Sequence, residues 1–421
     1  MQQVAAEELV SLARECGADD AGVVALSRPE LDDQREDICE AAPWARSLLS
    51  IVVRMNRDNL RTPARSVANL EFHHTGDAVN DTARRIVRAL EARGVRAINP
   101  AMGFPMEMDR FPQKLWVVSH KPVAAAAGLG SMGIHRSIIH PRFGSFVLLG
   151  TIVMSAEVDE ESQPIDFSPC VSCKLCVAVC PVGAIKSDGA FDFQSCYTHN
   201  YHEFMSGFAV LQEQAVLAKN VADYRRRVPQ DESASWWQSL SFGANYKAAY
   251  CLAVCPAGED VFAPFKASRR EFVADVVRPL QAKEEKVFVV ARGDAQAHVE
   301  KRFPHKTVRI VDNGLRPRTI DQLMQGMELS FQRGKAKGLS ATYHFVFSGA
   351  EEREVTVRIR EQALQVHEGR DGEADLTVRA DTATWLGFLA GEKSLLWALL
   401  LRRIRIRGPL PLMKAFAACF P

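Results

Sequence analysis

Cysteines in the middle of the chain are spaced as metal ligands. The run Cys170-Val-Ser-Cys173-Lys-Leu-Cys176-Val-Ala-Val-Cys180-Pro181 has three cysteines separated by two residues and a fourth after three more. Thiolates are soft ligands that suit iron, and this spacing is typical of 4Fe-4S sites whose fourth cysteine binds a neighbouring cluster. A structural zinc site instead needs paired Cys-x2-Cys knuckles. The run therefore predicts iron–sulfur chemistry with low-potential electrons.

A second group of cysteines repeats the end of this run. Cys251 and Cys255 are separated by three residues, and Pro256 follows. Because the last cysteine of each run binds the other cluster, we expect Cys180 and Cys251 to share a second cluster. We expect the first cluster to be held by Cys170, Cys173, Cys176 and Cys255.

The second cluster lacks part of its cysteine set. At the usual spacing one ligand would stand at position 248, which is Ala248, and Cys196 is the remaining candidate. Three interpretations stay open: a 4Fe-4S cluster with a non-cysteine fourth ligand, a 3Fe-4S cluster, or a single cluster in the whole chain. The conceivable non-cysteine ligands are His199, His202, Asn245 and water. The distant cysteines, expected to be buried as small hydrophobes, are Cys16, Cys39 and Cys419.

Composition bounds the class of protein. The chain has 421 residues, 47% of them hydrophobic and 24% charged, which is a globular profile with room for two or three domains. Its net charge of +1 gives no reason to expect a nucleic-acid partner. We find no apolar run long enough to span a membrane and no export signal at the start, so we expect a cytoplasmic protein. In that compartment ten cysteines favour metal ligands and thiols over disulfides.

The elements that must position these residues form four blocks, and together they predict an α+β multidomain protein. Helical spacing is seen at 4–16, 81–93, 203–227, 382–389, 393–401 and after Pro409. Apolar or alternating runs predict strands at 47–54, 115–119, 145–154, 287–291, 307–311, 343–347, 355–359 and 376–378. The blocks are an α/β cofactor-binding domain at 1–158, a ferredoxin-like module at 159–265, a connector at 266–317 and a strand-rich α+β domain at 318–421.

A glycine-rich loop lies in the first block. Its sequence, Gly128-Leu129-Gly130-Ser131-Met132-Gly133, fits G-x-G-x-x-G, but it follows an alanine run rather than a strand. A dinucleotide fingerprint needs a strand before the loop and a helix after it. We therefore expect the loop to approach a different flat cofactor with its backbone.

The first two blocks resemble epoxyqueuosine reductases and reductive dehalogenases. The resemblance rests on the alanine run into Gly128-Leu129-Gly130, the Pro141-Arg142-Phe143-Gly144-Ser145 turn, the strand after it and the cysteine runs, and it covers roughly residues 1 to 265. It implies a cobalamin held base-off by the α/β domain, approached by Gly128, Leu129, Gly130, Ser131 and Gly133, and reduced through the clusters.

This chain departs from the epoxyqueuosine reductase pattern at several positions. That pattern has tryptophan where Ser131 stands, a Gly-Lys pair where Gly133-Ile134 stands, and an acidic proton donor where Ser119 stands. A tRNA substrate is therefore not supported. His120 and Lys121 flank the position of the acid and are the candidate catalytic residues. His73, His74 and His135 also lie in the candidate region, and for any one of these candidates a surface or hydrogen-bonded structural role is the alternative.

The last block resembles the sterol carrier protein type 2-like lipid-binding domains. The matching features are the aromatic strand from Tyr343, the segment from Glu373 to Val378, Trp385, the alternating 404–407 strand and the closing Phe420-Pro421. Such domains enclose an apolar tunnel. The apolar run 395–401 also exceeds what one helix face can bury, although an ordinary core or a dimer interface would use it too.

These features lead to one leading hypothesis and two alternatives. The leading one is a cytoplasmic reductase that takes electrons from ferredoxin or flavodoxin through 4Fe-4S clusters to cobalamin and reductively cleaves an apolar substrate. The first alternative is a non-catalytic electron-transfer or corrinoid-reducing partner protein with a lipid-binding domain. The second is a flavin-dependent reductase that uses the same clusters.

Overall fold

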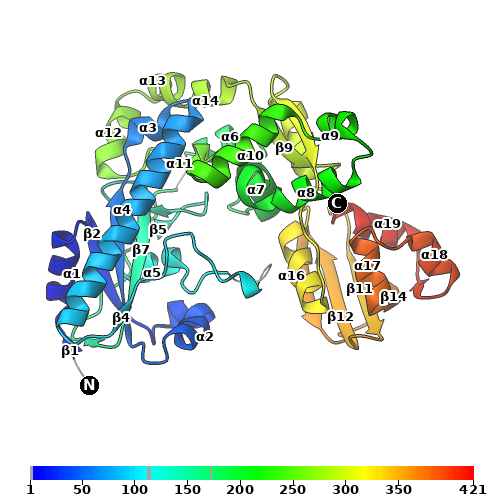
Figure 1. Ribbon diagram of the computed structural model, residues 1–421, viewed down its shortest axis with the longest axis horizontal. Helices are drawn as coiled ribbons and strands as arrows, with labels where there is room; N and C mark the ends of the chain where they lie inside the picture. Colours follow the sequence, from blue (N-terminus) through cyan, green and yellow to red (C-terminus); the bar gives the residue numbers. More distant parts are fainter. Residues whose placement is uncertain (1–2, 111–114, 171–172) are drawn as a thin grey trace. The chain divides into compact units, whose positions relative to one another are not determined.

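The computed structural model describes residues 3–110, 115–170 and 173–421. The chain divides into two compact units, one of residues 1–180, 185–191 and 237–283 and the other of residues 181–184, 192–236 and 284–421. The protein is a mixed α+β molecule (Figure 1). No helix in this described part has the length and apolar character that crossing a bilayer requires. The boundaries predicted at 158, 265 and 317 stay predictions.

A four-stranded antiparallel sheet forms the centre of the first unit. Its order is β2 (Asp20–Ala25), β3 (Ser47–Arg54), β7 (Val147–Met154) and β4 (Ala97–Ile98). Because every pairing in it is antiparallel, α+β describes this domain better than the α/β class predicted from the sequence. The smaller pairs are β1 (Gln3–Val4) with β8 (Glu157–Val158) and β5 (Ser131–Met132) with β6 (Ile138–Ile139).

Helices cover both faces of this sheet, as Figure 1 shows. Leu49, Ile51 and Val53 pack with α1 (Ala6–Glu15) and the long α4 (Arg65–Ala92). Leu48 and Val52 face the other way, against α2 (Asp32–Ala41) and α5 (His120–Ala126). This alternation follows from the two-residue period of a strand. The strand is therefore apolar throughout, as predicted for residues 47–54.

Short helices in the rest of the first unit surround the cysteines. They are α3 (Arg57–Arg61), α6 (Leu175–Val179), α11 (Tyr250–Ala253), α12 (Glu259–Ala267), α13 (Arg269–Phe272), the π-helix Val273–Val277 and α14 (Arg278–Ala282).

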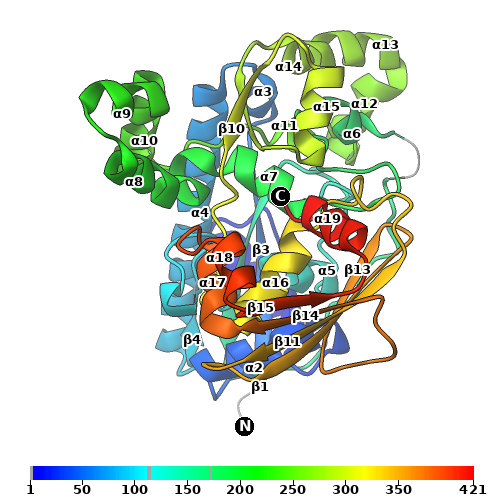
Figure 2. The same cartoon turned by 90° about the vertical axis from the view of Figure 1, so that its right-hand side faces the viewer.

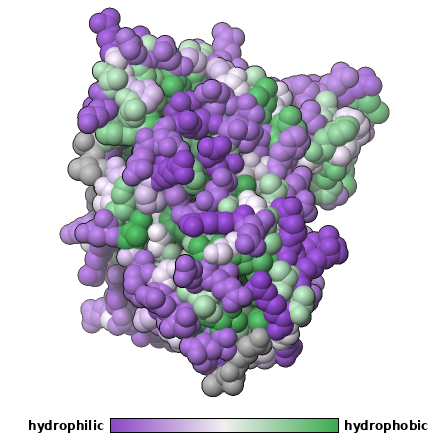
Figure 3. All heavy atoms as spheres, turned by 90° about the vertical axis from the view of Figure 1, so that its left-hand side faces the viewer, coloured by the Kyte–Doolittle hydropathy of each residue, from purple (hydrophilic) through white to green (hydrophobic). Residues whose placement is uncertain are grey.

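Figure 3 shows a face of the molecule on which hydrophilic residues predominate and hydrophobic ones are scattered.

Two layered parts make up most of the second unit. In the first, β9 (Lys286–Val290) and β10 (Thr307–Val311) are parallel and joined by α15 (Asp294–Arg302). In the second, five strands lie in the order β13 (Ala363–Glu368), β12 (Arg353–Arg360), β11 (Ala341–Ser348), β14 (Leu376–Asp381) and β15 (Ile404–Arg407). The helices α16 (Ile320–Ser330), α17 (Thr382–Leu389), α18 (Leu395–Leu400) and α19 (Leu410–Ala418) accompany this sheet (Figure 2).

Two predicted elements are wrong. Residues 115–119 form no strand: Leu115 accepts a hydrogen bond from the backbone of Glu107, and Ser119 donates one to the Gln34 side chain at 2.8 Å. The helix predicted over 203–227 is divided into the π-helix His202–Ser206, α8 (Phe208–Leu217) and α9 (Val221–Arg227). The second division occurs because the Asn220 side chain caps a new helix by accepting the amide of Asp223.

Candidate iron–sulfur site

The first cysteine run forms a loop that enters a short helix. Lys174 adopts the left-handed conformation (φ 53°) immediately before α6, and its Nζ donates to the carbonyl of Ser187 at 2.6 Å. Cys176 is the second residue of α6 and is buried, and Cys180 follows the helix directly. A tight left-handed bend thus reverses the chain between the second and third cysteines.

The second run repeats this local geometry. Ala249 is left-handed (φ 64°) immediately before α11, and Cys251 is the second residue of that helix. Matching Ala249 to Lys174 aligns Cys251 with Cys176 and Cys255 with Cys180. It also aligns Ala248 with Cys173, and Asn245 with Cys170. The second run is therefore a structural copy of the first in which two thiol positions carry other side chains.

The two runs lie side by side in one core. Leu175 and Val179 of α6 pack with Tyr250 and Ala253 of α11, and Cys173 borders this apolar cluster. Contact between these helices brings the two sets of thiols together.

Electrostatics show which thiols are neighbours. Burial raises the pKa of the Cys176 thiol, and the negative charges of Cys251, Cys255, Cys173 and Cys170 raise it further. Burial raises the pKa of Cys255 to about 11, with additional contributions from Cys173 and Cys170. These five thiols are thus close enough for their charges to influence one another, and thiolates are the soft ligands that iron–sulfur clusters use. Among the described residues, no group of three or more His, Cys, Asp or Glu side chains is arranged to hold a single metal ion.

Two arginines, which the sequence analysis did not single out, hold the second run. Arg65 of α4 donates to the carbonyl of Ala248 at 2.7 Å, and its guanidinium lies 4.9 Å from the centre of the Tyr250 ring. Arg61 of α3 donates to the carbonyl of Ala253 at 3.4 Å. Burial lowers the pKa of Arg61, while the Cys255 thiolate acts in the opposite direction. A positive charge therefore lies beside the thiols, and no spacing rule in the sequence could have indicated it.

The remaining predicted ligands have different surroundings. Asn245 accepts a hydrogen bond from the side chain of Asn69 at 2.8 Å, so its amide oxygen is already engaged. Cys196 lies in α7 (Phe193–Asn200), which belongs to the second unit, as do His199 and His202. Whether Cys196 reaches a cluster stays a prediction.

The candidate catalytic residues begin α5. The ring nitrogens of His120 lie 2.9 Å from Oγ1 of Thr151 and 3.0 Å from the carbonyl of Ala101. A carbonyl only accepts, so Nε2 carries the proton and Nδ1 accepts from the hydroxyl. Burial lowers the pKa of His120. Lys121 is more exposed and donates to the carbonyl of Arg136 at 2.6 Å.

The glycine loop packs against its own domain. Gly128 has a positive φ of 73°, and a side chain there would meet the carbonyl oxygen of Gln163. At Gly130 a side chain would meet the carbonyl oxygen of Ile139. The loop follows a helix and enters β5, so it lacks the strand–loop–helix order of a dinucleotide site. Close packing of the chain itself therefore accounts for these two glycines.

One atom beside this loop lacks a partner. His135 is 5% exposed, and its Nδ1 accepts the backbone N–H of Ser137. Its Nε2 is buried and has no hydrogen bond within the described residues. Burial, aided by the charge of Lys121, lowers the pKa of His135 to about 4. A buried polar atom without a partner is unusual, and a bound group could supply the missing hydrogen bond.

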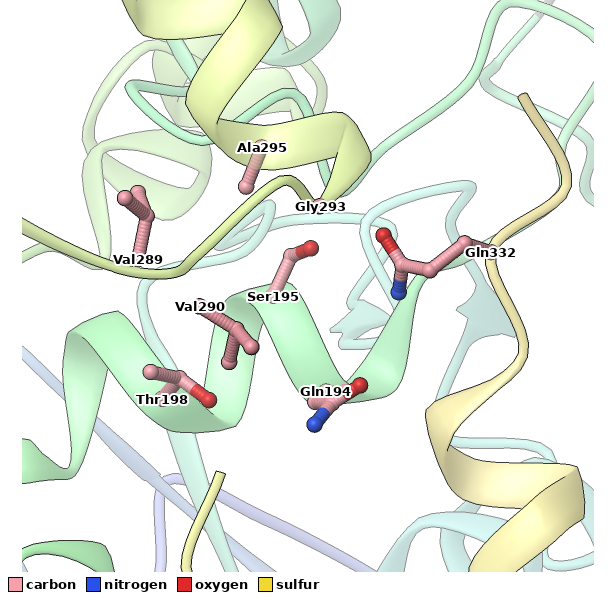
Figure 4. Close-up of a pocket in the computed structure, with 8 residues that line it drawn as sticks. All are labelled: Gln194, Ser195, Thr198, Val289, Val290, Gly293, Ala295 and Gln332. Atoms are coloured by element: carbon pink, nitrogen blue, oxygen red, sulfur yellow. The ribbon is translucent and has the colours of Figure 1, made fainter. Parts of the chain in front are cut away.

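A small cavity with both polar and apolar lining residues lies in the second unit (Figure 4). Gln194 and Thr198 of α7 line it together with Val289 of β9 and Gln332, and its volume is about 10 Å³. The amide atoms of Gln194 and the hydroxyl of Thr198 have no hydrogen-bond partner among the described residues. This is room for about one water molecule and not for a substrate.

An apolar cavity of about 70 Å³ lies in the C-terminal α+β part. Met327 of α16, Phe345 of β11, Trp385 of α17 and Phe416 of α19 contribute to its wall. Trp385 is 4% exposed, and its indole N–H has no hydrogen-bond partner in the described part of the chain. The surface that faces the cavity is apolar throughout.

Family models match two segments of the chain. Residues 164–186, which contain all four cysteines of the first run, match the 4Fe-4S binding domain. Residues 320–421, which form the five-stranded sheet and its helices, match the SCP-2 sterol transfer family. The fusion inferred from the sequence is thus confirmed at both ends: an iron–sulfur reductase-like part precedes a sterol-carrier-like domain.

Curated relatives are epoxyqueuosine reductases. The chain is 39% identical over 77 residues to that of Lactococcus garvieae, which is 18% of this chain and 21% of the relative. It is 26% identical over 180 residues to that of Gloeobacter violaceus, which is 43% of this chain and 54% of the relative. The chain therefore spans between a fifth and about half of the length of these relatives.

Solved structures give more distant likenesses. Epoxyqueuosine reductase from Bacillus subtilis is 17% identical with a TM-score of 0.37, over 77% of this chain and 84% of its own. A catabolic reductive dehalogenase in complex with 3-bromo-4-hydroxybenzoic acid is 14% identical with a TM-score of 0.40, over 70% of this chain and 37% of its own. A further epoxyqueuosine reductase, solved with a tRNA stem loop, is 16% identical with a TM-score of 0.36, over 76% of this chain and 84% of its own.

Proposed function

We propose that the protein is an iron–sulfur oxidoreductase that passes low-potential electrons to a cofactor for the reductive cleavage of an apolar organic substrate. The observation that carries the proposal is the packing of α6 against α11, which brings the thiols of the two cysteine runs together. The 4Fe-4S family match and the kinship with reductases support it. A single-electron donor such as ferredoxin or flavodoxin would supply the electrons.

We assign the first 4Fe-4S cluster to Cys170, Cys173, Cys176 and Cys255. Burial disfavours thiolates with no counterion, and bound iron offsets that cost. A second cluster would use Cys180, Cys251 and Cys196. Because Ala248 and Asn245 occupy the remaining positions of the second run, that cluster has an incomplete cysteine set.

The proposed acceptor of the electrons is a corrinoid. When bound, a corrinoid supplies a low-valent cobalt as reductant, while the protein contributes binding, orientation and protons. The unpartnered Nε2 of His135 fits a large polar ligand beside the loop. Gly128 and Gly130 fit less specifically, because the chain's own backbone accounts for both. The proposed contacts with Leu129, Ser131 and Gly133 follow from the resemblance alone.

Of the two candidate acids, we favour Lys121. Reductive cleavage consumes two electrons and a proton for each bond that is broken, so the site needs a proton donor. Both ring nitrogens of His120 are bonded inside the domain, and its pKa is lowered. We propose that His120 positions the start of α5 and that the neighbouring Lys121 ammonium donates the proton.

The sterol-carrier-like domain suggests that the substrate or a lipid is apolar. The cavity walls are aromatic and aliphatic, which suits a hydrocarbon body. We propose a ligand that places a hydrocarbon part in this cavity.

The alternative of a non-catalytic electron-transfer or corrinoid-reducing partner keeps specific support. Ser119 stands at the position of the acid in the resembling reductases, and the adjacent His120 is fully bonded. If Lys121 is not an acid, the site has iron–sulfur chemistry without its proton donor.

Anaerobic purification from a cobalamin-supplied host tests the proposal. We expect about four irons per chain for one cluster and up to about eight for two. We also expect one cobalt per chain after reconstitution with cobalamin. Iron without cobalt binding would contradict the corrinoid, and no iron would contradict the whole proposal. A Cys39→Ser variant, altered in α2 outside both runs, serves as the control.

Turnover separates the enzyme from its non-catalytic alternative. With a chemical reductant, hydrophobic halides, epoxides and ethers should be reduced, and Lys121→Met should abolish product without loss of iron. Epoxyqueuosine-containing tRNA belongs in the panel because the curated relatives are epoxyqueuosine reductases. Reduction of that tRNA alone would contradict the apolar substrate, and no turnover would favour the electron-transfer partner.

A further inference from the structure

The segment around α18 exposes an unusual amount of apolar surface. Leu396 is 80% exposed, Trp397 62%, Leu400 70% and Leu401 61%, while Ala398 alone in this helix is buried. Leu410, the first residue of α19, is 65% exposed. A single exposed leucine is ordinary, but a contiguous group of this kind marks an interaction surface.

Exposed arginines follow this segment directly. The arginines of 402–407 and the neighbouring Arg379 of β14 are all exposed. Across the edge of the sheet Arg405 of β15 lies opposite Arg379, and like charges in register repel. No salt bridge among the described residues involves Arg379, Arg402, Arg405 or Arg407. Ile404 and Ile406 of β15 pack in the same core as Ala398 of α18, so the alternate residues Arg405 and Arg407 lie on the other face of the sheet. The exposed Arg402 and Arg403 follow the end of α18 directly and present positive charge beside it.

We propose that the segment 396–403 docks on the surface of an anionic lipid bilayer. The leucines would enter the region between the headgroups and the acyl chains, and Trp397 would lie at the headgroup level, which suits its amphipathic ring. Arg402 and Arg403 would bind lipid phosphates. Positive charge beside exposed apolar side chains favours this occupant over an apolar partner protein, which would leave the arginines without counterions.

A short loop connects the segment to α17, a helix that lines the apolar cavity. Residues 390–394 join α18 to α17, and Trp385 and Leu389 of α17 line the apolar cavity. The loop is held to α17 because the amides of Glu392 and Lys393 donate to the carbonyl of Gly387. Figure 2 shows α18 next to α17. A ligand leaving a bilayer at α18 would therefore be close to the cavity wall, to which Trp385 and Leu389 of α17 contribute. This inference goes beyond the proposed reductase activity and does not depend on the corrinoid.

Co-sedimentation of the full chain with vesicles tests the proposal. We expect binding to phosphatidylcholine vesicles that contain phosphatidylglycerol, little binding to pure phosphatidylcholine, and weaker binding in high salt because salt screens the arginines. The variant Leu396→Ser/Leu400→Ser should reduce binding at least tenfold. The variant Arg402→Gln/Arg403→Gln should remove the preference for anionic vesicles.

A matched control uses apolar residues that are equally exposed elsewhere. Leu240 is 65% exposed and Phe242 71%, in a segment without arginines. The variant Leu240→Ser/Phe242→Ser should bind vesicles as the native chain does. In the native chain brominated lipid should quench part of the tryptophan fluorescence, and Trp397→Phe should remove that part.

Two results would overturn the proposal. One is vesicle binding that is absent, or unchanged in the α18 variant. The other is a dimer of the native chain that the α18 variant dissociates while neither protein binds vesicles, which would make the segment an interface between two copies. Iron content and circular dichroism check the folding of each variant, and failure of the corrinoid test leaves these outcomes unaffected.

Discussion

The two cysteine runs share a backbone design but not a set of ligands. In both, a left-handed residue, Lys174 or Ala249, precedes a short helix whose second residue is cysteine. Neither is glycine, so each bend costs roughly 1 kcal/mol and persists because its surroundings impose it. The first run has thiols at all four positions, whereas the second has Ala248 and Asn245 at two of them. The difference teaches that the same backbone bend forms with or without thiols at these two positions.

The largest expected effect comes from removing a ligand of the first run. Cys173→Ser should lower the iron content by about four atoms per chain and abolish the visible absorption of the first cluster. Its positional counterpart in the second run, Ala248→Ser, should leave iron unchanged. Equal iron in Cys173→Ser and the native chain would show that this run does not hold the cluster.

The next effect comes from restoring a thiol to the second run. Ala248→Cys introduces a ligand at the position that matches Cys173, so it should increase iron per chain and alter the EPR spectrum of the reduced protein. Ala249→Cys, one residue further on, should do neither. If neither the iron content nor the EPR spectrum changes in Ala248→Cys, a thiol at this position reaches no cluster, which would contradict its match to Cys173.

A smaller effect tests the charge beside the second run. Positive charge stabilises a reduced cluster, which is more negative than the oxidised one. Arg61→Gln should therefore make the reduction potential of the cluster beside Arg61 more negative by tens of millivolts. For one electron, about 59 mV corresponds to a tenfold change in the equilibrium constant for reduction. Arg61→Lys keeps the charge and should change the potential less. A redox titration followed by EPR measures both, and a shift to more positive potential would contradict the assignment.

The smallest effect tests whether the two bends are equivalent. Glycine adopts the left-handed conformation without steric cost but gains entropy in the unfolded chain. Lys174→Gly and Ala249→Gly should therefore each change the free energy of unfolding by less than about 1 kcal/mol, and by similar amounts. Denaturation of both variants measures this. A loss of several kcal/mol in one alone would show that the bends are not equivalent.

Local patterns explain the elements that the sequence predicted well. The apolar run 47–54 is β3 with the bounds expected, and the alternating run at 343–347 lies in β11. Both depend on side-chain periodicity within one strand. The failure at 115–119 has the opposite cause, because an apolar run becomes a strand only when a neighbouring strand pairs with it. Here the side chain of Gln34 and the backbone of Glu107 take those hydrogen bonds.

The sequence by itself determined that this protein has an iron–sulfur cysteine run and a sterol-carrier-like domain, since both are recognised from the spacing of residues close together in the chain. Only the tertiary structure showed that Arg61 and Arg65, more than 180 residues away, hold the second run. It also showed that His120 is fully bonded and that α18 is exposed. The physical reason is that spacing fixes which residues can share a local site, whereas burial, charge and hydrogen-bond partners depend on what the rest of the chain brings beside them.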